Sequence, residues 1–188
     1  MTFHFIKYLT EETDRREIHQ DKLKFEKTEL DPVMSEATLK YHYDGLASKY
    51  FERYNAGEGD PDFNYGGAIL HNIFFANLTP PRAANKPEGL SKSIIDEKYG
   101  SFDKFKEAVE KTAMGIQGSG WVYMDINGDI KTIANHEYKK TMKIALLIDW
   151  WEHAWALDYQ QDKAKYLSNI WRIINWDVVN DRLTTAGD

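Results

Sequence analysis

The segment Asp149-Trp150-Trp151-Glu152-His153 places a carboxylate and an imidazole four residues apart. It follows the apolar run 144–148, which is typical of a buried strand, and two indoles lie beside the polar groups. A carboxylate and an imidazole in dry, aromatic surroundings are unfavourable unless another group compensates them, and a metal ion does this best. The segment therefore predicts half of a metal site, with the other ligands elsewhere in the chain.

The composition limits which metals and which partners are possible. The chain has no cysteine, which excludes disulfides, thiolate metal sites and thiol catalysis. Nitrogen and oxygen ligands remain, and these suit iron, manganese, zinc or copper. A net charge of −6 argues against a nucleic-acid partner. No apolar run approaches the ~20 residues of a membrane span, so we expect no membrane partner. The charged residues 11–16 argue against a secretory signal, and we expect a cytoplasmic location.

Two further histidines are candidate ligands because they lie on apolar helical faces. His42 lies among tyrosines and a leucine, and His71 lies within an almost wholly apolar run. A single histidine of this kind is more often a satisfied core residue. Two of them on adjacent helices, together with Asp149 and His153, make a plausible site for a redox metal with an open position. From the residues alone, the metal and the structural interpretations stay about equally open.

The spacing of apolar residues predicts the elements that position these groups. Residues 1–30 form a polar arm, partly helical, in which His4 and His19 are expected to be solvated. We expect helices at 36–55, 65–75, 91–99, 101–114 and 153–182, and strands at 121–125, 130–134 and 143–148. The Asn127-Gly128 turn favours a hairpin between the first two strands. The predicted fold class is α+β, with an N-terminal antiparallel helical hairpin over 31–82 and a C-terminal α/β domain with a three-stranded antiparallel sheet over 90–188.

Six blocks of the chain resemble the iron/manganese superoxide dismutase family, in the order in which that family has them. They are Tyr41-His42-Tyr43, 66–78, 100–106, Gln117-Gly118-Ser119-Gly120-Trp121, 149–154 and 171–176. The resemblance covers roughly residues 28–183. The block Asp149-Trp150-Trp151-Glu152-His153-Ala154 is the most specific of them.

The resemblance implies a metal centre and an activity. His42, His71, Asp149 and His153 would bind one iron or manganese ion per subunit, completed by a solvent ligand. The implied enzyme converts superoxide to dioxygen and hydrogen peroxide by alternating oxidation and reduction of that ion. A homodimer or higher assembly is implied as well, in which Glu152 reaches the ligand histidine of the partner.

The resemblance also implies a polar group that contacts the solvent ligand. In many members this group is a glutamine, either from the second helix or from the loop after the second strand. Here Gly67 occupies the helix position and His136 the loop position, so we expect His136 in this role and Tyr50 as the other gateway residue. Some iron-using and metal-flexible members also carry histidine there, which favours iron or metal flexibility. The alternative is that His136 is a solvated turn histidine, because the loop between it and Asp149 is short.

Several positions depart from the family pattern. Leu46 and Ala156 replace a histidine and a tyrosine that form one hydrogen bond across the dimer, and losing both partners costs less than losing one. Lys163 replaces an arginine near the substrate funnel, which keeps the charge and loses the bidentate fork. Leu70 replaces an asparagine. The four ligand positions are nevertheless unchanged, so an active dismutase is expected. The alternatives are a dismutase-fold metal-binding protein with weak or no activity and, less favoured, a 2-His-1-carboxylate oxygenase.

Overall fold

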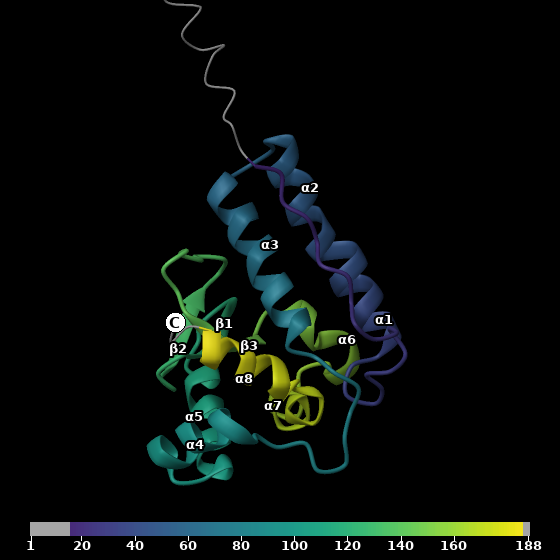
Figure 1. The fold of residues 1–188 in the computed structure, drawn as a ribbon. Coiled ribbons are helices and arrows are strands. Elements are labelled where there is room, and N and C mark those ends of the chain that lie inside the picture. Colours follow the sequence, from purple (N-terminus) through teal and green to yellow (C-terminus); the bar gives the residue numbers. More distant parts are fainter. Residues whose placement is uncertain (1–15, 186–188) are drawn as a thin grey trace, which may run out of the picture.

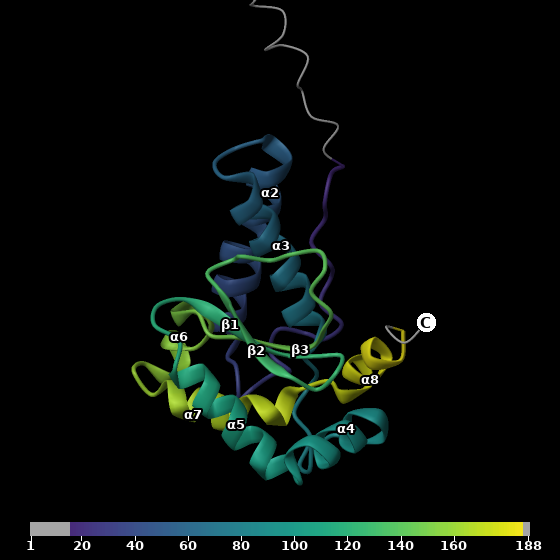
Figure 2. The same ribbon diagram turned by 90° about the vertical axis from the view of Figure 1, so that its left-hand side faces the viewer.

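The computed structural model describes residues 16–185 of the chain (Figure 1). A three-stranded sheet lies between a pair of antiparallel helices and a second group of helices, as Figures 1 and 2 show from two directions. This arrangement confirms the predicted α+β fold class. His19 is exposed, as predicted, and His4 lies outside the described residues. The division at residues 31–82 and 90–188 stays a prediction.

The first predicted helix, 36–55, exists over almost this length, but its winding changes twice. It consists of α1 (Glu36–Leu39), a π-helical stretch η1 (Lys40–Ala47) and α2 (Ser48–Ala56). Ser35 begins it as an N-cap, with its side chain accepting a hydrogen bond from the backbone N–H of Thr38. The wide turns of η1 contain Gly45.

The second helix, α3 (Pro61–Ala76), begins four residues before the predicted start. Asp60 caps it by accepting a hydrogen bond from Phe63 N–H, and Pro61 takes the first helical position, where its missing N–H costs nothing. α2 and α3 pack side by side as an antiparallel hairpin. Of the two histidines that the sequence analysis selected from the helices, His71 lies in α3 and His42 lies in η1, directly before α2.

The described part of the N-terminal arm contains no helix, so the prediction of partial helix is wrong for residues 16–30. Residues 16–23 instead run without helix or strand along α2 and α3 (Figure 1), and residues 27–30 form turns. The amide of Asn55 bonds both backbone groups of Ile18, and the amide of Asn72 accepts from the N–H of Asp21. Side-chain amides on the hairpin thus form hydrogen bonds with backbone groups of the arm, and these backbone groups do not need helical hydrogen bonds.

The sheet has the order β2-β1-β3, with both pairings antiparallel. Its strands are β1 (Gly120–Asp125), β2 (Ile130–Ala134) and β3 (Ile144–Asp149), each within a residue or so of the prediction. Every residue of β1 and β3 is buried. The register places Trp121 beside Asp149, so the last residue of β3 lies next to the first large side chain of β1.

The helices below the sheet follow the prediction in part. α4 (Gly89–Tyr99) and α5 (Phe102–Met114) are confirmed. The predicted helical stretch 153–182 is broken into η2 (Glu152–Ala154), α6 (Ala156–Tyr159), α7 (Lys163–Ile170), η3 (Trp171–Ile173) and α8 (Trp176–Thr185). Gln160 has a φ of 53°, which ends α6, and Asp162 caps α7. Tyr166, Trp171 and Trp176 of this region are buried in the core, whereas Tyr159 is half-buried.

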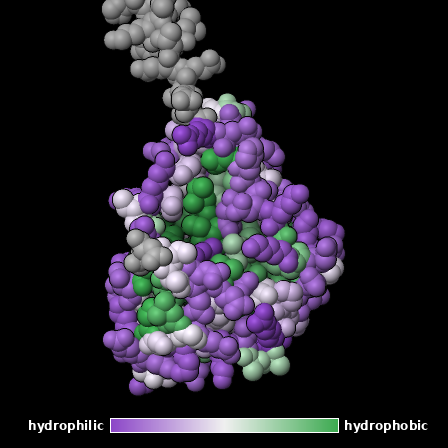
Figure 3. All heavy atoms as spheres, in the orientation of Figure 1, coloured by the Kyte–Doolittle hydropathy of each residue, from purple (hydrophilic) through white to green (hydrophobic). Residues whose placement is uncertain are grey.

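The layers meet in one continuous hydrophobic core. α2 and α3 cover one face of the sheet, and α4, α5, α7 and α8 lie on the other side (Figure 2). The surface in the view of Figure 3 is mostly hydrophilic, with hydrophobic residues reaching it in small separate areas. Within residues 16–185, none of the helices combines the length and the apolar character that crossing a membrane requires.

Candidate metal centre

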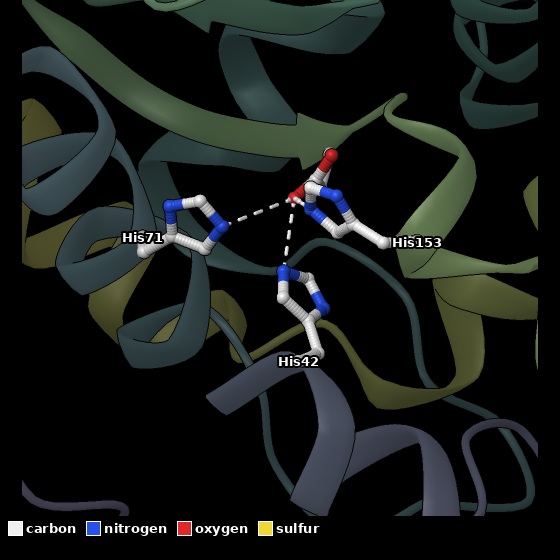
Figure 4. A group of neighbouring side chains, drawn as sticks. His42, His71 and His153 are labelled. Atoms are coloured by element: carbon white, nitrogen blue, oxygen red, sulfur yellow. Dashed lines mark ion pairs between the residues drawn. The ribbon is translucent and has the colours of Figure 1, made fainter. Parts of the chain in front are cut away.

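Four side chains from four elements of the fold converge at the end of β3. His42 comes from η1, His71 from α3, Asp149 from the last position of β3, and His153 from η2. Each offers a ligand atom, and these atoms all lie within 4.8 Å of one another. Figure 4 shows the imidazoles pointing from separate elements toward a central carboxylate oxygen. The helical hairpin and the sheet therefore bring together all four predicted ligands.

The carboxylate oxygen Oδ2 of Asp149 lies at the centre of this cluster. It is 3.1 Å from Nε2 of His42, 3.4 Å from Nε2 of His153 and 3.8 Å from Nε2 of His71. These four atoms are buried, and none has a hydrogen-bond partner within the described part of the chain. Buried polar atoms are almost always hydrogen-bonded. Four unpaired ones that converge on one point form the donor set that a metal ion needs.

The other polar atoms of two of these residues are occupied in a way that orients the ligand atoms. Nδ1 of His71 lies 2.6 Å from the carbonyl oxygen of Gly67, which can only accept, so Nδ1 carries the proton and Nε2 keeps its lone pair. The second oxygen of Asp149, Oδ1, accepts from the backbone N–H of Trp151 at 2.8 Å. The hydroxyl of Tyr166 donates to the carbonyl of Asp149 at 3.1 Å. Nδ1 of His42, by contrast, has no described partner.

The electrostatics give these groups the protonation states that metal binding requires. Burial lowers the pKa of His42 and, more strongly, that of His71, so both imidazoles are neutral near pH 7. Burial by itself would raise the pKa of Asp149, but the neighbouring His153 and His42 outweigh it and hold this pKa below its ordinary value. The neutral imidazoles of His42 and His71 beside the ionised carboxylate of Asp149 can bind a cation without first releasing protons.

His136 lies beside the cluster, and the interpretation of it as a solvated turn residue is wrong. Only 1% of its surface is exposed. Asn135 before it adopts a φ of 47°, which turns the chain inward after β2. The carbonyl of His136 then packs against Gly66, where a Cβ would overlap it. The ring of His136 stacks on Trp151, with centroids 4.4 Å apart, and burial lowers its pKa to about 4.

Tyr50 and Phe63 complete the ring-lined wall next to the cluster. Tyr50 stacks on His71 at 5.3 Å and meets the ring of His136 edge-on at 4.7 Å. Burial raises the pKa of Tyr50 to about 12, so its hydroxyl stays protonated. Phe63, which the sequence analysis missed, lies 4.7 Å from His136 and is 38% exposed. The signal for it was available, because Phe63, Gly67 and His71 are spaced by four residues and share one face of α3.

Two of the predicted site residues lie apart from the cluster. Glu152 is exposed at the start of η2. The ammonium of Lys163 lies over the ring of Trp150, 5.4 Å from its centroid. Both residues line a shallow surface depression together with Trp155 and Ala156. The structure thus gathers His42, His71, Asp149, His153, Tyr50 and His136, and leaves Glu152 and Lys163 on a neighbouring surface.

Comparison with known proteins agrees with this geometry. Residues 87–182 match the family model for the C-terminal domain of iron/manganese superoxide dismutases. The chain is 33% identical to superoxide dismutase (Fe) of Bacteroides fragilis, over 86% of this chain and 97% of that protein. It is 30% identical to superoxide dismutase (Mn/Fe) of Aeropyrum pernix, over 84% of this chain and 86% of that protein. It is 39% identical to the mitochondrial superoxide dismutase (Mn) of Aspergillus fumigatus, over 67% of this chain and 63% of that protein. With a buried, unpaired set of three imidazoles and one carboxylate at the end of β3, the chain belongs to the iron/manganese superoxide dismutase family.

Proposed function

We propose that this protein catalyses the dismutation of superoxide at an iron or manganese ion bound by His42, His71, Asp149 and His153. The observation that carries the ligand assignment is the convergence of four buried ligand atoms, within 4.8 Å of one another, that lack hydrogen-bond partners. The activity follows from membership of a family whose similar members are named superoxide dismutases.

The ion supplies reversible one-electron oxidation and reduction, and the chain sets the conditions for it. The ionised carboxylate of Asp149 adds one negative charge to three neutral imidazoles, which favours the trivalent state of the ion. Burial of Asp149 and His42 excludes bulk water and strengthens their electrostatic effect on the ion. The Gly67 carbonyl, which accepts from Nδ1 of His71, and the backbone N–H of Trp151, which donates to Asp149, hold the two ligand side chains in orientation.

We infer that Tyr50 and His136 act at the substrate side of the centre. The rings of both residues lie next to the ligand set. His136 is buried and Tyr50 is half-buried, so their polar atoms are shielded from bulk solvent. Phe63 narrows the approach beside them. Lys163 supplies a positive charge on the neighbouring surface, where it can attract the superoxide anion.

We also propose that the ion is iron, or that the site accepts both metals. Three imidazoles and a carboxylate bind either one, so the choice depends on surrounding groups such as His136. Relatives of this chain are named for iron, for manganese and for both. Growth with each metal, followed by metal analysis and activity assays of the purified protein, tests this proposal.

A homodimer with one ion per subunit, in the cytoplasm, is the assembly that we propose. Glu152 is exposed, and the Nδ1 atom of His153 hydrogen-bonds to none of the described residues. Glu152 of a second copy would therefore find a free donor at His153. Leu46 and Ala156 stand at the two positions where the family pattern has a polar pair across the dimer. Because both side chains are apolar, they can form an apolar contact between the two copies instead.

The replacement of Asp149 by asparagine tests the proposed function. Asp149→Asn keeps the shape of the side chain and removes the charge, so we expect loss of bound metal and a fall of superoxide consumption to the level of the free ion. Asp125→Asn is the matched control, since Asp125 is also buried but bonds Lys131 in the β1–β2 hairpin. Wild-type protein that is fully loaded with iron or manganese and still inactive would refute the dismutase proposal in favour of a metal-binding role.

A further inference from the structure

Residues 16–23, which we call the strap, lie along both helices of the hairpin and are bound to them by side-chain amides (Figure 1). On α2, the amide of Asn55 accepts from the N–H of Ile18 at 3.0 Å and donates to its carbonyl at 2.8 Å. On α3, the amide of Asn72 accepts from the N–H of Asp21 and donates to the carbonyl two residues earlier, both at 3.0 Å. The two amides thus replace the neighbouring strand that an extended backbone would otherwise pair with.

Two of the residues that bind the strap directly follow proposed ligands in the sequence. Asn72 comes after His71 in α3. Tyr43 comes after His42 in η1. The amide of Gln20 donates to the carbonyl of Tyr43 at 2.9 Å, and the hydroxyl of Tyr43 donates to the carbonyl of the residue after Gln20 at 2.7 Å. The strap therefore joins η1 to α3 beside two ligands that come from different elements.

The strap is fixed at one end and held more weakly along its length. Phe25, just after it, is buried in the core. Within the strap, Ile18, Gln20 and Leu23 are half-buried, and the other residues are exposed. The hydrogen bonds to the two asparagines are exposed to solvent, and such bonds each contribute little net stability. The strap can therefore detach while the core stays folded.

A cavity of about 400 Å³ lies between residues 21–24 and α3. Phe75 of α3 lines this cavity, and only 5% of its surface is exposed. Its ring lies 4.9 Å from the ring of His42 and 5.2 Å from the ring of Tyr43. Detachment of the strap opens this cavity to solvent and frees the hydroxyl of Tyr43. Phe75 then remains as the cover of His42 on this side of the hairpin.

We propose that the strap ties η1 to α3 and thereby slows the loss of the metal ion, so that the ion leaves the centre after the strap has detached. This role rests on the proposed function for its ligand set, although not for the reaction. An ion bound to both His42 and His71 holds η1 and α3 together, as the docked strap does. Two contacts that favour the same arrangement favour each other equally, so a bound ion must also keep the strap docked.

Hydrogen–deuterium exchange, read by mass spectrometry at single amides, measures docking of the strap in the full chain. Asn55→Ala removes both bonds to Ile18 and alters no residue next to a ligand. Alanine favours a helix, so the substitution does not weaken α2 itself. Glu52→Ala is the matched control, because Glu52 is exposed on the same helix and does not hydrogen-bond to the described residues of the strap.

Because the strap detaches as one unit, we expect Asn55→Ala to accelerate exchange about fivefold at Ile18 and also at Asp21, whose own partner is unchanged. Protein that carries the iron or manganese with which it is purified should lose it to excess EDTA about threefold faster in Asn55→Ala. Glu52→Ala should match the wild type in both measurements. In the wild type, removal of the ion should accelerate exchange at Asp21.

Faster exchange in Asn55→Ala with an unchanged rate of metal loss would overturn the proposal, as would acceleration at Ile18 alone. If Asn55→Ala does not fold, the wild type still decides, since equal exchange of the strap with and without the ion would also overturn it. The result is separate from the activity of the protein. An inactive wild type that holds its ion, and loses it faster in Asn55→Ala, would refute the dismutase proposal and leave the role of the strap standing.

Discussion

The ring of His136 occupies the space in which a side chain on residue 67 would lie. A Cβ built on Gly67 would be 3.1 Å from Cδ2 of His136 and 2.8 Å from two ring atoms of Tyr50. Helix α3 therefore supplies room, and the loop after β2 supplies the polar group that fills it. A large residue at position 67 and the inward-facing His136 exclude each other.

This close packing predicts that Gly67→Ala is harmful. The added methyl group must displace Tyr50 or His136, both held by neighbouring rings, so we expect a loss of stability of about 1–3 kcal/mol and reduced dismutase activity. Urea unfolding and an activity assay measure the two effects. Gly45→Ala is the control, because its Cβ would meet only the Lys40 carbonyl at 3.7 Å. Equal stability of the two variants would show that the pocket around Gly67 can expand.

The low pKa of His136 predicts that acid destabilises the fold. In the unfolded chain this imidazole titrates near its ordinary pKa of 6.5, and in the folded chain near 4. Between these values the unfolded state binds more protons, so stability is complete above pH 6.5 and falls as the pH decreases toward 4. For His136 we expect a loss of about 2 kcal/mol between pH 7 and pH 5. Urea unfolding of the metal-free protein at both pH values measures it.

Two variants separate this contribution from those of other histidines. His136→Gln should show a smaller loss between pH 7 and pH 5 than the wild type, with a remainder from His42 and His71, whose pKa values burial also lowers. His19→Gln should behave as the wild type, because His19 is exposed. A pH dependence that His136→Gln leaves unchanged would mean that His136 is already protonated in the fold.

The exposed position of Glu152 predicts a role between subunits. If Glu152 bonds the ligand His153 of a second copy, then Glu152→Ala leaves a buried donor without its partner and should weaken the dimer about tenfold or more. Analytical ultracentrifugation over a range of concentrations measures this. Glu110→Ala, on the exposed side of α5, should leave the dimer intact. A wild-type protein that stays monomeric at high concentration would contradict the prediction.

The position of Lys163 predicts an effect on the encounter with substrate. Its ammonium lies above Trp150 near the surface, so Lys163→Gln should lower kcat/KM about twofold to fivefold at low ionic strength. The difference should shrink as salt screens the charge. Stopped-flow measurement at several salt concentrations tests this, with the exposed Lys165 of the same helix as control. A deficit that persists at high salt would point to a structural role for Lys163.

The sequence alone predicted the candidate ligand set and the order of the elements. The strand that ends at Asp149, the imidazole four residues later and the two histidines on apolar helical faces are local patterns. Their chemistry is visible without coordinates, because a buried carboxylate and buried imidazoles need compensation. The cap at Ser35 likewise marks where the first helix begins, since it satisfies a backbone N–H group that the helix itself cannot, whereas α3 begins after the cap at Asp60, four residues before the predicted start.

Only the tertiary structure decided how the surrounding groups act. Whether His136 faced solvent or the metal centre depended on the turn at Asn135 and on the room above Gly67, which lie far apart in sequence. The contact between Trp121 and His136 has the same origin, because the sheet register and the loop bring the indole N–H to within 3.3 Å of Nδ1 of His136. Local spacing specifies which atoms an element offers. The protonation and orientation of those atoms depend on contacts between elements, and packing alone fixes these contacts.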